Sequence, residues 1–151
     1  MTEFNRKAGV LWTGDLQTGT GLLSTESKAL FEIPYNYPKR FGEEVGLNPE
    51  ELIAAAHAAC FGMMVAVTLE KNGFTPVQTE ITATCTLASK ESGGFEINKM
   101  RLHARCEVPD IDEASFNKIV MEADKGCPVS NLLRDGLTIE ITTDLIQTHG
   151  A

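Results

Sequence analysis

The hydrophobic positions along this chain change period several times, and each period predicts a different kind of element. In residues 81–87 and 100–108, apolar and polar side chains alternate, which is the pattern of half-buried antiparallel strands. Four further strands are predicted from shorter apolar runs: 10–12, 22–25, 29–33 and 137–142. With the helices that interrupt them, these strands indicate an α+β fold with antiparallel sheets.

The longest apolar stretch, Leu52 to Leu69, carries no formal charge except that of His57 when protonated. Asn48 is a good N-cap and Asn72-Gly73 is a stop signal, so we expect one helix from Pro49 to about Lys71. A helix that is apolar on all sides is normally buried. A 151-residue chain has trouble surrounding such a helix. We therefore expect a long buried central helix in an intertwined dimer.

The rest of the chain predicts two more helices and one long loop. Asp112 caps a helix that ends near Gly126, and Cys127-Pro128 opens a short helix that ends before Gly136. Residues 34–47 are rich in turn formers and predict an irregular loop, which in a compact domain is often functional. Because no linker, repeat or low-complexity segment divides the chain, we expect a single domain over residues 1–151.

Composition and charge exclude several classes of function. The chain has 13 basic and 21 acidic side chains, a net charge of −8, so we expect no nucleic-acid partner. The amino terminus has no apolar segment of the signal-peptide kind, and we expect a cytoplasmic protein whose cysteines are reduced. The apolar helix approaches the length of a membrane span, but its six alanines, its histidine and its acidic flank weaken that interpretation, and we expect no membrane partner.

The four cysteines differ in placement. Cys85 and Cys106 lie on the apolar faces of predicted strands and are interpreted as core residues. Cys60 lies within the apolar helix, and Cys127 lies at the start of a short helix, where thiols tend to be reactive. Placement alone therefore favours Cys127 as the more acidic thiol. His57 precedes Cys60 by one helical turn, so either a Cys–His nucleophilic pair or a hydrogen-bonded histidine in a helix interface is open.

Several motifs together resemble the OsmC/Ohr family of thiol-dependent organic hydroperoxide reductases, and the OsmC branch in particular. The segments that carry the resemblance are Asn48 to Leu52, Ala54 to Phe61 (AAAHAACF), Gly126 to Ser130 (GCPVS) and Pro34 to Phe41. The similarity extends from Trp12 to the last predicted strand. It implies an OsmC-like fold and a peroxidase that reduces organic hydroperoxides, and hydrogen peroxide is a further substrate to consider.

The resemblance also implies roles for four residues. Cys60 would be the peroxidatic thiolate and Cys127 the resolving cysteine, in place of the order that placement alone favours. Arg40 would be the cation that holds the thiolate, and Glu50 would orient Arg40. The family implies no cofactor, and it suggests that an external thiol, such as a dihydrolipoyl group on a partner protein, returns the enzyme to the reduced state.

Simple magnitudes support a cationic partner for Cys60. Lowering a thiol pKa by about three units takes roughly 4 kcal/mol, which one guanidinium at about 4 Å supplies in an effective dielectric constant of 20. Glu50 precedes Cys60 by ten residues, or roughly 15 Å along one helix. We therefore expect antiparallel helices in a symmetric dimer to bring Glu50 of one subunit to Cys60 of the other. The apolar residues interpreted as a pocket for alkyl hydroperoxides are Phe41, Phe61, Met63 and Met64.

Three other functions remain open from the sequence. A hydrolase would use Cys60 with His57 and would not need Cys127. A binding module would hold a hydrophobic ligand and would tolerate the loss of Cys60. A Cys–His metal site is less favoured, because the chain has no C-x-x-C pair, and neither metal nor cofactor is expected.

Overall fold

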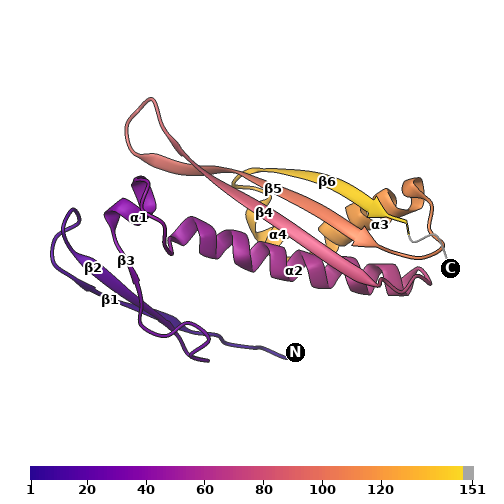
Figure 1. Cartoon of the computed structure of the whole chain (residues 1–151), viewed down its shortest axis with the longest axis horizontal. Coiled ribbons are helices and arrows are strands. Elements are labelled where there is room, and N and C mark those ends of the chain that lie inside the picture. Colours follow the sequence, from indigo (N-terminus) through magenta and orange to yellow (C-terminus); the bar gives the residue numbers. More distant parts are fainter. Residues whose placement is uncertain (148–151) are drawn as a thin grey trace. The chain divides into compact units, whose positions relative to one another are not determined.

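The computed structural model describes residues 1–147 and divides into two compact units, Met1–Leu52 and Ile53–Ala151. The first unit is a three-stranded antiparallel sheet in the order β1-β2-β3, followed by the short helix α1 (Figure 1). Its elements are β1 (Ala8–Thr13), β2 (Thr20–Thr25), β3 (Ile33–Tyr35) and α1 (Tyr37–Phe41). That the whole chain forms one domain stays a prediction.

Two details of the first unit differ from the prediction. The third strand begins only at Ile33, because Lys28 and Glu32 have positive φ angles of 60° and 51° that interrupt extended backbone. The predicted loop 34–47 contains a helix, since the Asn36 side chain accepts the Lys39 backbone N–H at 3.0 Å and caps α1. Asn36, with Pro38 two residues later, was a helix-cap signal within a segment dominated by turn formers.

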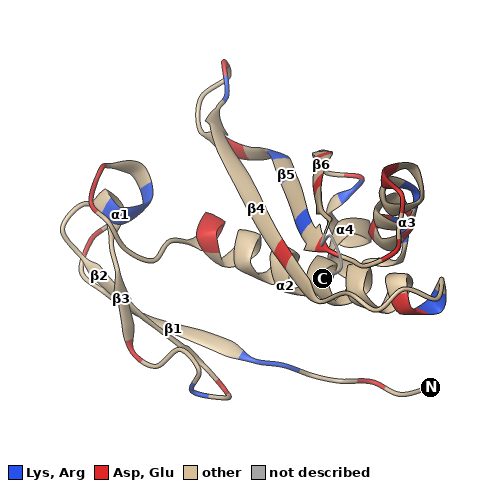
Figure 2. Ribbon diagram, turned by 45° about the vertical axis from the view of Figure 1, so that its right-hand side comes forward, with Lys and Arg blue, Asp and Glu red and all other residues tan. Residues whose placement is uncertain are grey.

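The helix α2 (Pro49–Lys71) has the predicted bounds. The Asn48 Oδ1 atom accepts the Glu51 N–H at 2.8 Å, and the charged residues of α2 gather at its two ends (Figure 2). Burial of α2 within one chain is confined to one side. His57 and Phe61 are buried, whereas Ala59 and Met63 are exposed, so the predicted burial on all sides would need a second molecule.

The second unit contains a three-stranded sheet in the order β4-β5-β6 and two helices. Their bounds are β4 (Gln78–Ser89), β5 (Phe95–Glu107), α3 (Glu113–Gly126), α4 (Pro128–Leu133) and β6 (Thr138–Ile146). The β4–β5 pair is antiparallel, but β6 lies parallel to β5, with Met100 opposite Ile139. The prediction of purely antiparallel sheets is therefore wrong for β6. A parallel neighbour requires a long crossover connection, and α3 and α4 form it.

The core of the second unit joins α2, the sheet and α3. Phe61, Val65 and Leu69 of α2 pack in one cluster with Leu102 and Phe116. By length and composition alone α2 could cross a membrane, but the core helix of a soluble protein meets the same two criteria. The same packing fixes the section of α2 that carries Cys60 against the crossover that carries Cys127.

Candidate active site

The two cysteines that the sequence singles out lie together. Cys60 is on α2, and Cys127 is the residue between α3 and α4, where it caps the end of one helix and the start of the other. Their Sγ atoms are 3.4 Å apart, within hydrogen-bonding distance for thiols, and both are free thiols. Cys60 is half-buried and Cys127 is buried. The geometry allows a disulfide after a small approach of the two sulfurs, because an S–S bond is about 2.05 Å long.

The surroundings of Cys60 do not by themselves make it a thiolate. Burial raises the pKa of the Cys60 thiol above its ordinary value, and the neighbouring Cys127 thiol raises it further. The Val129 backbone N–H, which bonds to the sulfur, lowers the Cys60 pKa but does not outweigh burial. An additional positive charge is therefore needed for reactivity near neutral pH.

Arg40 and Glu50 form the second predicted pair. The Arg40 Nη2 atom lies 2.7 Å from Glu50 Oε1, and Arg40 Nε lies 3.2 Å and 3.3 Å from the two carboxylate oxygens. Such two-pronged contacts fix a guanidinium in orientation as well as position. Glu50 is buried at the first turn of α2. The structure thus brings Arg40 to Glu50, and both residues belong to the first unit, whereas the cysteines belong to the second.

A cavity of about 170 Å³ opens beside Arg40. Its walls are largely apolar and aromatic, and Phe41 packs at 5.0 Å from the Arg40 guanidinium. The residues that line this cavity are Trp12, Leu16, Tyr35, Asn36, Tyr37, Arg40 and Phe41. Of the four residues predicted to line a substrate pocket, Phe41 does line this one, whereas Phe61 belongs to the buried core. Sequence patterns did not indicate Trp12, Tyr35 or Tyr37 as cavity residues. Trp12 and Tyr35 come together through the β1–β2–β3 register, in which both lie opposite Gly21, and Tyr37 follows on α1.

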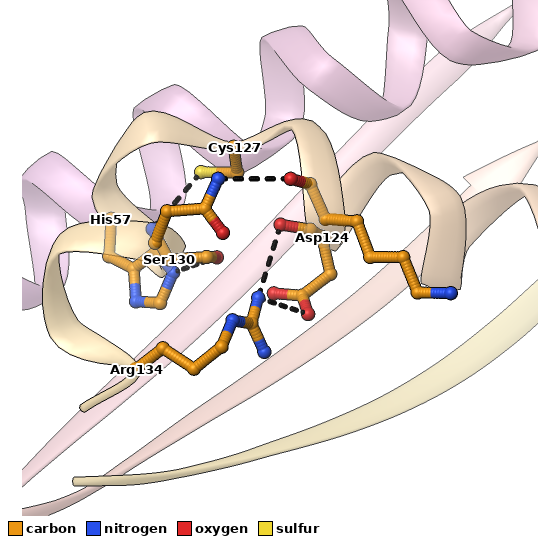
Figure 3. A network of polar contacts seen from close by, with 7 residues as sticks. His57, Asp124, Cys127, Ser130 and Arg134 are labelled. Atoms are coloured by element: carbon orange, nitrogen blue, oxygen red, sulfur yellow. Dashed lines mark hydrogen bonds and ion pairs between the residues drawn. The ribbon is translucent and has the colours of Figure 1, made fainter.

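His57 lies in a buried polar network with residues that sequence reasoning did not single out (Figure 3). Its Nε2 atom is 2.7 Å from Ser130 Oγ, and its Nδ1 atom has no hydrogen-bond partner within residues 1–147. Burial lowers the pKa of His57 below its ordinary value. Neither ring nitrogen bonds to Cys60, so the geometry of a Cys–His hydrolase is not formed. Nearby, Arg134 Nη2 lies 2.7 Å from the carboxylate of the buried Asp124.

The structure also places the two remaining cysteines. Cys106 is fully buried in the core cluster, as predicted, and Cys85 is half-buried on β4. Within the described part of the chain, no group of three or more histidine, cysteine or acidic side chains could hold a metal ion. The described side chains therefore offer two candidate pairs for chemistry, Cys60–Cys127 and Arg40–Glu50.

Comparisons with known proteins show what this chain is similar to. A family model described as OsmC-like protein matches residues 42–142. Peroxiredoxin OsmC of Escherichia coli (strain K12) is 43% identical over 136 residues, which cover 90% of this chain and 94% of the relative. Organic hydroperoxide resistance protein OhrB of Bacillus subtilis (strain 168) is 32% identical over 113 residues, or 74% of this chain and 79% of the relative.

One solved structure is similar to this chain over nearly its whole length. The organic hydroperoxide resistance protein of Elizabethkingia anophelis superposes with a TM-score of 0.78 and 26% identity, covering 96% of this chain and 99% of that chain. The similarity thus includes β1–β3 and β6 as well as the helices.

Proposed function

Because this chain belongs to the OsmC-like protein family, we propose that it is a cysteine-based peroxidase that reduces organic hydroperoxides to alcohols. The observation that carries the proposal is the 3.4 Å approach of the Cys60 and Cys127 sulfurs, which lie 67 residues apart in sequence. A two-cysteine peroxidase needs one thiol that the hydroperoxide can reach and a second thiol close enough to form a disulfide with it. The half-buried Cys60 and the adjacent Cys127 meet both requirements.

The reaction proceeds in two balanced steps. The Cys60 thiolate attacks the distal oxygen of the hydroperoxide, the O–O bond breaks, and the alkoxide leaves as the alcohol after taking up a proton. Cys60 is then a sulfenic acid. Cys127 attacks its sulfur, an S–S bond forms, the S–O bond breaks, and water leaves. Two electrons from an external dithiol restore both thiols, and dihydrolipoyl groups on partner proteins have the chemistry to deliver them.

We propose that Arg40 supplies the positive charge that Cys60 needs, with Glu50 holding the guanidinium. Burial raises the Cys60 pKa, so a thiolate near pH 7 requires compensation of several kcal/mol, and one close guanidinium supplies about that much. Glu50 precedes Cys60 by ten residues on one continuous helix, which is about 15 Å along the axis. A second copy of α2, packed antiparallel, would bring its own Arg40–Glu50 pair to this thiol.

A homodimer is therefore part of the proposal. The exposed side of α2 carries small or flexible apolar side chains, among them Ala55, Ala59 and Met63, which allow two helices to approach closely. The aromatic cavity beside Arg40 would receive the apolar group of an alkyl or aryl hydroperoxide, which hydrogen peroxide lacks. The proposed location is the cytoplasm, where thiol reductants keep both cysteines reduced.

The test is a disulfide map of the reduced protein after an excess of cumene hydroperoxide, beside Cys127→Ser and Cys85→Ser variants. We expect a Cys60–Cys127 bridge in the parent and in Cys85→Ser, and an over-oxidised Cys60 in Cys127→Ser. Unchanged thiols in the parent would overturn the peroxidase proposal and favour a binding module on the same fold. Hydrolytic activity that survives Cys127→Ser would instead favour the hydrolase.

A further inference from the structure

We propose that His57 is a positioning residue for the resolving step, and that its hydrogen bond to Ser130 holds Cys127 where it can condense with oxidised Cys60. This inference rests on the proposed function, since it assigns a part in that reaction to a buried side chain outside the four residues already discussed. His57 lies on α2 one turn before Cys60, so it stands on the element that carries the peroxidatic thiol.

Two hydrogen bonds connect α2 to the resolving sulfur (Figure 3). The first joins His57 Nε2 to Ser130 Oγ at 2.7 Å, across 73 residues of sequence, and both side chains are fully buried. In the second, the Ser130 backbone N–H donates to Cys127 Sγ at 3.5 Å. A shift of Ser130 relative to His57 would therefore move the cap that orients the Cys127 sulfur.

The corner between α3 and α4 is braced internally as well. The Cys127 backbone N–H donates to the Asp124 carbonyl at 3.1 Å, and the Arg134 guanidinium bonds both that carbonyl, at 3.4 Å, and the Asp124 carboxylate, at 2.7 Å. These contacts hold the turn between α3 and α4 in one conformation. The hydrogen bond between His57 and Ser130 connects this turn to α2, the helix that carries Cys60.

We expect His57 to act by orienting Ser130 through a hydrogen bond and not by carrying a charge. Because burial lowers its pKa, the ring is neutral near pH 7 and adds little to the stability of a thiolate. Its other nitrogen, Nδ1, has no hydrogen-bond partner within residues 1–147. The orientation of the imidazole ring therefore depends on the hydrogen bond between Nε2 and Ser130. Loss of His57 should therefore affect the geometry of condensation and leave the acidity of Cys60 nearly unchanged.

Condensation of the Cys60 sulfenic acid with Cys127 competes with a second oxidation of Cys60. The position of the Cys127 sulfur determines which of the two reactions is faster. The Cys60 sulfenic acid either reacts with Cys127, giving a disulfide and water, or meets a second hydroperoxide, giving a sulfinic acid and another alcohol. The first path is intramolecular and depends on the approach of the two sulfurs, now 3.4 Å apart. Misplacement of a reacting group by about 1 Å can slow such a step by about 100-fold.

The experiment separates the two steps. Rapid-quench alkylation and mass spectrometry follow sulfenic acid, disulfide and sulfinic acid after cumene hydroperoxide is mixed with the protein. The variants are His57→Leu, which removes the hydrogen bond, His57→Gln, whose amide can restore it as donor or acceptor, and Ser130→Ala, which removes the other partner. The matched control is His103→Gln, because His103 lies on β5 and bonds Thr142 and Asp144 instead.

In His57→Leu and Ser130→Ala we expect condensation to slow by about tenfold to 100-fold and the sulfinic fraction to rise in proportion, while oxidation of Cys60 changes less than about twofold. His57→Gln should recover most of the condensation rate, and His103→Gln should match the parent. If His57→Leu does not fold, Ser130→Ala decides the matter with the same expected slowing.

Two outcomes would overturn the positioning role. One is an unchanged ratio of disulfide to sulfinic acid in folded His57→Leu or Ser130→Ala, with only the melting temperature lowered, which would mean that the bond is structural. The other is an equal loss in both steps. Failure of the proposed function gives a different result, because the parent protein would then form no Cys60–Cys127 disulfide at all.

Discussion

Two arginine–carboxylate pairs in this molecule have the same shortest contact and opposite expected roles. Arg40–Glu50 and Arg134–Asp124 both close at 2.7 Å, and in each the carboxylate is buried while the guanidinium is partly exposed. Arg134 bonds the backbone of its own helix corner, so its charge is used for structure. Arg40 lines an aromatic cavity, where part of its charge faces a space that a ligand can enter. The expected role of each ion pair thus depends on the other groups around its arginine: backbone atoms for Arg134 and a cavity for Arg40.

Of the substitutions that test this difference between the two arginines, we expect Arg40→Gln to have the largest effect. Removing the guanidinium should slow the oxidation of Cys60 by cumene hydroperoxide by about 100-fold or more, because one close charge supplies roughly 4 kcal/mol toward the thiolate. The apparent pKa of Cys60, measured from the pH dependence of alkylation in a Cys127→Ser background, should rise. A large loss of rate without a rise in that pKa would show that Arg40 acts on the substrate alone.

The counterpart is Arg134→Gln, which should act on stability instead. It leaves the buried Asp124 carboxylate without its cation, which should lower the free energy of unfolding by about 2 kcal/mol. The rate of Cys60 oxidation should stay within about threefold of the parent. Urea denaturation measures the change, and Arg101→Gln is the control, because its contact with Glu140 is exposed and should contribute less than about 1 kcal/mol. Equal loss of stability in both variants would contradict the assignment.

A milder change, Glu50→Gln, tests the orienting carboxylate. The amide can still accept a hydrogen bond from Arg40 but no longer fixes it with charge, so we expect about a tenfold slower oxidation of Cys60. Stopped-flow kinetics under excess hydroperoxide measure it. If Glu50→Gln is as severe as Arg40→Gln, the carboxylate does more than orient.

The smallest effect concerns pH, through the histidine beside the structural pair. The pKa of His57 is lowered first by burial, while Asp124 raises it and Arg134 lowers it. Because the folded pKa lies below the unfolded value of about 6.5, the unfolded chain binds more protons below that pH, and stability falls as the pH drops. Between pH 7.5 and 5.5 we expect a loss of about 1 kcal/mol that His57→Gln abolishes. Unfolding in urea at both pH values measures it, and an equal loss in both proteins would assign the effect to other groups.

Local signals in the sequence account for much of this structure. Asn48 and Asn72-Gly73 bound α2 correctly, and the alternation in residues 81–87 and 100–108 identifies β4 and β5. The parallel pairing of β6 was missed, because a strand alternates in the same way whichever direction its neighbour runs. The helix α1 was missed because Asn36 and Pro38 signal turns and helix starts alike.

The sequence predicted the two candidate pairs of the site but not the buried polar network around His57. Cys60, Cys127, Arg40 and Glu50 were named from a family resemblance, and the structure forms both pairs, although their roles stay proposals. Asp124 and Arg134 carry no local signal, since nothing in their neighbouring sequence indicates that they pair, and Ser130 appears in the sequence only as part of a motif without a role of its own. Buried polar networks arise from contacts between distant segments, such as the 73 residues between His57 and Ser130.

The parallel crossover has a consequence for how the chain matures during synthesis. Cys127 lies in the connection between β5 and β6, so it leaves the ribosome after Cys60, Cys85 and Cys106. Pairing between strands so distant in sequence forms slowly compared with a hairpin such as β4–β5. A nascent chain therefore carries Cys60 before Cys127 is in place. An oxidised Cys60 in such a chain would have no Cys127 with which to form a disulfide, and oxidation beyond the sulfenic acid is irreversible.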